Sequence, residues 1–84
     1  MSALALGALA FAAPTVQAAS ASSCREAVDN TRYHLELADS PTSATDWQSV
    51  RDDAQRYLDE HPWQSPGNQA LQQDIDDLNR LCAA

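Results

Sequence analysis

Apolar residues recur every three or four positions in three segments of this chain, the spacing that places them on one face of an α-helix. The segments cover about residues 24–38, 45–61 and 66–82. Their stripes consist of Cys24, Ala27, Val28, Thr31, Leu35 and Ala38, then Trp47, Val50, Ala54, Tyr57, Leu58 and His61, then Leu71, Ile75, Leu78 and Cys82. The sequence has no alternation of β-branched and polar residues that would indicate a strand. The pattern predicts an all-α fold in which three helices share one core.

Helix-start signals precede all three segments. The candidate caps are Ser23 with Glu26, Thr45 with Gln48, and Ser65 or Asn68. The first two pairs have the spacing of a capping box, in which each member satisfies a free N–H group of the first turn. Pro62 cannot continue a helix, so the second helix is expected to end at His61.

An uncharged apolar segment precedes the helices. Residues 3–13 contain no polar side chain, and as a helix they span only about 16 Å, against roughly 30 Å for a bilayer core. Small residues follow, as at a signal-peptidase site. We expect residues 1–21 to be a signal peptide, cleaved after Ala18 or Ala21, and residues 22–84 to be a periplasmic or secreted domain. Residues before Ser22 are not expected to pack on that domain.

The two cysteines, Cys24 and Cys82, lie near the two ends of the expected domain. In an exported chain they predict a disulfide, which a domain with so small a core needs. A simple up-down-up bundle would hold them roughly 20 Å apart, whereas a disulfide requires Cα atoms within about 7 Å. Either residues 39–44 or residues 62–68 must therefore return along the bundle, or the first helix crosses the others steeply. The predicted fold is a three-helix bundle stapled by a disulfide, with one long return connection.

The expected mature domain is acidic. Its formal net charge is −7, and it contains arginine but no lysine. Arg25 and Arg32 are expected to pair with Asp29 and Glu36, each one helical turn away. Because phosphate neutralisation supplies most nucleic-acid affinity, we expect no nucleic-acid partner. Such a charge suits a basic protein partner.

Residues that carry catalysis are scarce. The chain has two histidines, and its carboxylate clusters lack the spaced ligands and glycine of a calcium loop. It has no spacing typical of a zinc site, a phosphate-binding loop or a Ser-His-Asp arrangement. We therefore expect no catalytic residue, no bound metal, no cofactor and no enzymatic activity.

Residues 21–24 (Ala-Ser-Ser-Cys) offer a second interpretation, because they resemble a bacterial lipoprotein cleavage box. Lipidation of Cys24 would tether the domain to a membrane and leave Cys82 unpaired. Ten residues separate the apolar run from Cys24, and Ala21 stands where a larger apolar residue is usual. A membrane association is expected only under this alternative.

Residues 57–62 (Tyr-Leu-Asp-Glu-His-Pro) follow Val50 and Ala54 and precede a helix that ends in Cys82. This half of the chain resembles periplasmic immunity proteins that protect bacteria from type VI secretion amidase toxins, over about 30 residues. In that family a helix likewise ends in Tyr-Leu-x-x-His-Pro and the last helix ends in a cysteine. The N-terminal half departs from the family, since the glycine and additional cysteine expected there are absent. The resemblance implies binding to a toxin.

These observations favour a small non-enzymatic protein-binding module, such as an inhibitor or immunity protein. The alternative is a periplasmic structural or envelope-stress protein that acts like an acid-sensitive chaperone. A homodimer is compatible with either function. The partner surface is expected around Trp63, in a loop stiffened by prolines, with Tyr33 and Leu37 as a second apolar patch. Asp59 and Glu60 would steer a basic partner to it.

Overall fold

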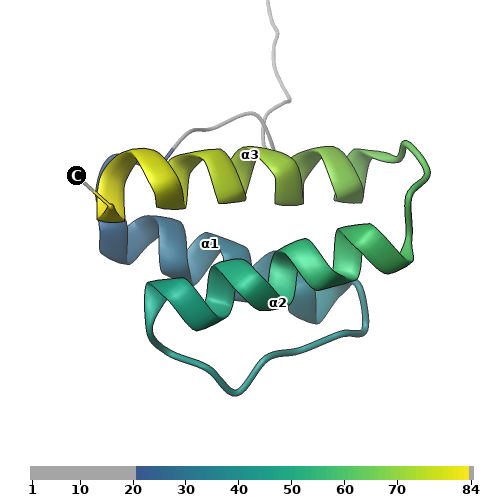
Figure 1. Cartoon of the computed structure of the whole chain (residues 1–84), viewed down its shortest axis with the longest axis horizontal. Helices are drawn as coiled ribbons and strands as arrows, with labels where there is room; N and C mark the ends of the chain where they lie inside the picture. The colour runs from purple at the N-terminus through teal and green to yellow at the C-terminus, as the bar shows by residue number, and fades with distance from the viewer. Residues whose placement is uncertain (1–20, 84) are drawn as a thin grey trace, which may run out of the picture.

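The computed structural model describes residues 21–83, which form a three-helix bundle (Figure 1). Its helices are α1 (Cys24–Leu37), α2 (Trp47–Glu60) and α3 (Pro66–Cys82). All three helices contact one another, and the described residues contain no strand. The predicted all-α bundle is therefore confirmed, with helix bounds within two residues of those expected.

The return connection is the first one, residues 38–46 (Figure 1). It leaves the end of α1 and runs back along the bundle, so that α1 and α2 point the same way while α3 points the opposite way. Asp39, at φ 60, ends α1 with a left-handed residue. The Thr42 hydroxyl donates to Asp53 on α2 and fixes the middle of the connection.

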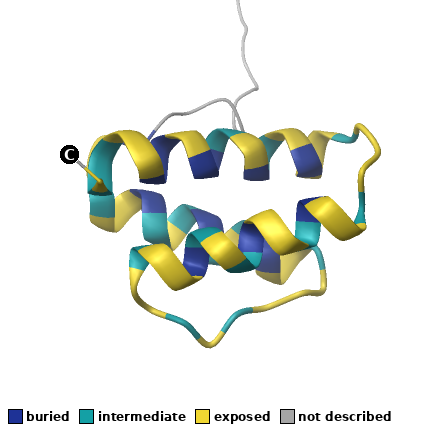
Figure 2. Ribbon diagram, in the orientation of Figure 1, coloured by how far each residue is buried: buried dark blue, intermediate teal, exposed yellow. Residues whose placement is uncertain are grey.

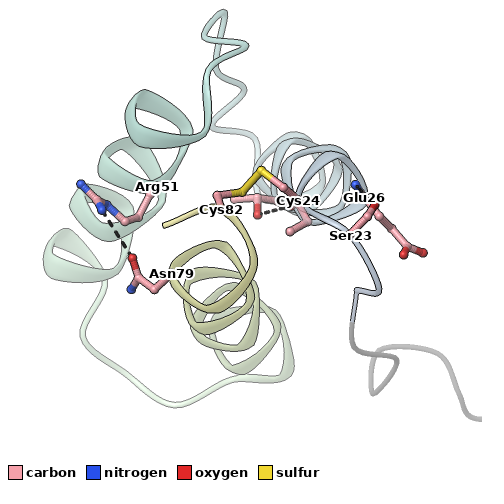
Figure 3. Close-up of a disulfide and its surroundings, with 8 residues drawn as sticks. Ser23, Cys24, Glu26, Arg51, Asn79 and Cys82 are labelled. Atoms are coloured by element: carbon pink, nitrogen blue, oxygen red, sulfur yellow. Dashed lines mark hydrogen bonds between the residues drawn. A yellow bond between two sulfur atoms is a disulfide. The ribbon is translucent and has the colours of Figure 1, made fainter. Parts of the chain in front are cut away.

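This topology brings the start of α1 and the end of α3 to the same end of the bundle (Figure 3). The predicted disulfide between Cys24 and Cys82 is present, with a Cα–Cα distance of 4.9 Å. The geometric conflict in the sequence is thus resolved by the return connection.

The inward faces of the three helices form one narrow core, in two adjoining clusters (Figure 2). One cluster consists of Leu35, Ala54, Leu58, Leu71 and Ile75, and the other of Ala21, Ala27, Val50 and Leu78. With the exception of Ala21, these residues belong to the stripes that the sequence predicted. Burial of these stripes supplies the main driving force for folding.

The N-caps agree with the sequence at two helices. Ser23 accepts the Glu26 N–H at 3.1 Å, and Ser65 accepts the Asn68 N–H at 3.1 Å. At α2 the expected cap, Thr45, is wrong, because Asp46 accepts the Ser49 N–H instead. A carboxylate is favoured there, since its charge also complements the positive end of the helix dipole.

Ala21 corrects the expectation that residues before Ser22 do not pack on the domain. It is 4% exposed, and its N–H donates to the Asp77 carboxylate at 3.1 Å. Cleavage after Ala18 would keep this contact in the mature protein, whereas cleavage after Ala21 would remove it. The rest of the expected signal peptide, residues 1–20, lies outside the described residues.

Gly67→Ala is expected to stabilise the domain by about 0.5 kcal/mol, because alanine loses less backbone entropy in a helix. Gly67 lies in the first turn of α3, and an added Cβ would meet only the Ser65 hydroxyl, at 4.0 Å. Urea unfolding monitored by circular dichroism measures the change. A loss of stability would mean that residue 67 needs a conformation other than helix.

Candidate functional site

The end of the bundle away from the disulfide contains a cavity of about 200 Å³. It lies where the end of α1 meets the α2–α3 connection. Its lining residues are His34, Leu37, Ala38, Tyr57, Trp63, Ser65, Gly67 and Asn68. A cavity of this size is smaller than most small-molecule sites but large enough for one protein side chain.

The exposed large apolar side chains among the described residues are Tyr33, Leu37 and Trp63, at 56%, 65% and 58% exposure. Leu37 and Trp63 line the same cavity, although the sequence assigned them to separate patches. Tyr33 lies outside it, beside a second cavity under the return connection. Leu37 of the second predicted patch therefore lies with Trp63, whereas Tyr33 lies apart from both.

Contacts between three aromatic rings connect the loop that carries Trp63 to the end of α2. The His61 ring stacks on Tyr57 at a centroid distance of 4.0 Å, and Trp63 meets His61 edge-on at 5.1 Å. His61 Nδ1 lies 2.8 Å from the Tyr57 carbonyl oxygen, close to the end of α2. His61 thus acts as a spacer between the helix and the exposed tryptophan.

Asn68, in the first turn of α3, holds the same loop by hydrogen bonds. This buried side chain donates from Nδ2 to the carbonyl oxygens of His61 and Trp63, both at 2.7 Å. The sequence predicts Asn68 only as a possible helix cap. An asparagine after Pro-Gly is compatible with many roles, so the sequence contains no signal for this one.

A histidine–aspartate pair adjoins the cavity, which His34 lines. His34 Nδ1 is 2.5 Å from Asp74 Oδ2, and the Asp74 side chain is only 5% exposed. Burial raises the pKa of Asp74; His34 opposes this shift, and the neighbouring negative charge of Asp77 adds to it. The sequence pattern indicates no role for His34, because its partner lies 40 residues away.

An Asp–His pair can orient an imidazole for proton transfer. Catalysis would also require a nucleophile or an activated water next to it. Within residues 21–83, His34 is hydrogen-bonded to Asp74 and to no serine or threonine hydroxyl. The same residues contain no cluster of three potential metal ligands. In this arrangement the pair serves to position the His34 ring.

Asp59 and Glu60, expected to steer a partner, do not line the cavity. Asp59 accepts from Gln55 at 3.0 Å and lies along the groove between α2 and α3. Glu60 is exposed at the end of α2. Both carboxylates therefore lie at the same end of the domain as the cavity, but neither contacts its interior.

No family model, curated protein or solved structure matches this chain. Among the described residues, none of the helices has the length and apolar character needed to cross a membrane.

Proposed function

We propose that this chain is a small periplasmic or secreted protein-binding module without enzymatic activity, and that the cavity beside Trp63 receives a side chain of its partner. The observation that carries this proposal is the meeting of Leu37 and Trp63, exposed apolar residues from different elements, at one cavity. Other residues form the buried core clusters, so folding does not require the burial of Leu37 or Trp63. Aromatic anchors of this kind dominate the energetics of many interfaces.

The cavity walls are held in place before binding. Asn68 links the loop to the first turn of α3, and the stacked ring of His61 supports Trp63. Pro62 and Pro66 further restrict the loop backbone. A preorganised surface loses less conformational entropy on binding, which favours affinity from a small contact area.

The charge of the domain favours a basic partner. The net charge is −7, and Asp59 and Glu60 add negative charge to the end of α2. Such charges accelerate association with a positive surface more than they add affinity. A basic toxin or enzyme that the domain neutralises, in the manner of an immunity protein or inhibitor, fits this description.

Capture from a bacterial periplasm, with the tagged full chain as bait, tests the proposal. A module of this class should retain one protein in a stoichiometric complex, which light scattering after size exclusion would show. The matched bait is Leu37→Ser, which changes an exposed cavity residue and no core contact. Equal recovery of that partner by both baits would contradict the assignment of the cavity. A mixture of unrelated unfolded proteins would instead support a chaperone.

The chaperone alternative is favoured by one observation, a buried carboxylate whose charged form is held by hydrogen bonds. The carboxylate is that of Asp77, which is almost fully buried. Burial alone would raise the pKa of Asp77, but hydrogen bonds from Arg80, the Ala21 amide and Gln73, with the charge of Arg80, lower it below its ordinary value. Acid would therefore remove a stabilising contact between α3 and the N-terminal end of the domain.

Asp77→Asn is expected to lower the free energy of unfolding by about 1.5 kcal/mol at pH 7, because it removes charge-assisted hydrogen bonds. A depressed pKa stabilises the fold above the ordinary aspartate pKa of about 4, and this contribution disappears as pH falls through the folded pKa. Unfolding curves for both proteins should therefore converge at low pH. A difference that is constant down to about pH 2 would contradict the assigned ionisation.

A further inference from the structure

Two of the five arginines lack an acidic partner within residues 21–83. Arg51, Arg56 and Arg80 form ion pairs with Asp52, Asp53 and Asp77. Arg25 and Arg32 form none, so the pairs expected from their one-turn spacing to Asp29 and Glu36 are wrong. Exposed pairs of this type are weak, and long side chains give them up readily for other contacts.

Both of these arginines line one groove of about 500 Å³ at the disulfide end of the bundle. They lie two turns apart on α1, so they share one face of the helix, about 10 Å apart along its axis. The apolar lining comes from Val28 and Trp47, with Cys24 at one end. A groove of this size is within the range of small-molecule sites.

Arg32 is the more unusual of the two. Its Nε is buried and has no hydrogen-bond partner within the described part of the chain. A buried donor left unpaired costs free energy, and a charged group costs more than a neutral one. The planar guanidinium group of arginine can bind the two oxygens of a carboxylate. The groove thus contains an apolar wall and two arginines, Arg25 and Arg32, that form no ion pair within residues 21–83.

We propose that this groove binds a small amphipathic carboxylate, with the carboxylate on Arg32 and Arg25 and the apolar body against Val28 and Trp47. Asp29 also lines the groove and leaves a local net charge of one positive unit, which favours a monoanion over a phosphate dianion. The site lies at the other end of the bundle from the Trp63 cavity and does not depend on the protein-binding proposal.

Titration of octanoate into ¹⁵N-labelled full chain tests the site. Saturable shifts of the Trp47 indole N–H and the Arg32 Nε–H, at concentrations below about 10 mM, are expected. Arg32→Met should weaken octanoate binding at least about tenfold, as the loss of a charge-assisted hydrogen bond requires. Arg25→Gln should weaken it less, and provides a second test should Arg32→Met fold poorly.

Arg56→Met is the matched control, because it removes the same charge from an exposed side chain on α2. It should leave octanoate binding unchanged. Equal weakening by Arg56→Met would indicate attraction to overall charge and would overturn the proposal. Octanol binding as tightly as octanoate would show that the guanidinium groups do not contribute, and absence of saturable shifts at both reporters would exclude the site.

Discussion

Removal of the Cys24–Cys82 disulfide is expected to lower the free energy of unfolding by about 4 kcal/mol. The two cysteines are 58 residues apart, so the bond restricts nearly the whole described chain when it unfolds. The loop-entropy relation gives about 4 kcal/mol for a loop of this length. This is close to the entire stability of a small domain, which suggests that the reduced protein populates unfolded states at room temperature.

Urea unfolding of the Cys24→Ala/Cys82→Ala double variant against the oxidised wild type measures the effect. Intact-mass analysis after alkylation supplies the control, since oxidised protein should contain no free thiol. Alkylation of both cysteines without prior reduction would show that the bond does not form in solution. A diacylglycerol mass on Cys24 would support lipidation instead.

Trp63→Ala is expected to weaken binding to the captured partner by about 2 kcal/mol or more, which is a loss of roughly thirtyfold in affinity. The side chain is 58% exposed and lines the cavity, so its truncation removes apolar contact area from the interface rather than from the core. Isothermal titration with the purified partner measures the change in affinity.

The matched control is Gln64→Ala, in the same exposed loop but outside the cavity. It should change affinity little. Thermal unfolding of both variants separates binding from folding, because Trp63→Ala should lower the melting temperature only slightly. A sharp fall in melting temperature with unchanged affinity per folded molecule would show that Trp63 covers the core and that the site is misplaced.

The sequence predicts the helices well because their stripes are regular and their ends contain strong signals. Leu35, Val50 and Leu78, all fully buried, lie on the predicted faces. Pro66 and Ser65 similarly mark the start of α3. These features depend on local backbone preference and spacing, which a single sequence contains.

The composition of the two loops does not show which one returns along the bundle. The lengths of the loops in the structure explain why it is the first. Residues 38–46 span about 30 Å when extended, enough to retrace a 14-residue helix of about 21 Å. Residues 61–65 span only about 16 Å and can make only a tight turn. The prolines of the second loop stiffen it, but they do not lengthen it.

The candidate sites depend on contacts that the sequence does not encode locally. His34 meets Asp74 across 40 residues, and Ala21 meets Asp77 across 56. Such pairs follow from how the helices are rotated against one another, which the apolar pattern alone does not specify. The sequence places Leu37 and Trp63 outside the core stripes, whereas only the fold shows that they meet at one cavity.

The most direct test of the protein-binding proposal is site-specific photo-crosslinking in a bacterial periplasm. A photoreactive phenylalanine replaces Leu37 at the cavity or, as a control, the exposed Gln48 at the start of α2. The proposal predicts one discrete heavier adduct, identifiable by mass spectrometry, from position 37 and none from position 48. A discrete adduct from position 48, with none from position 37, would contradict the proposal.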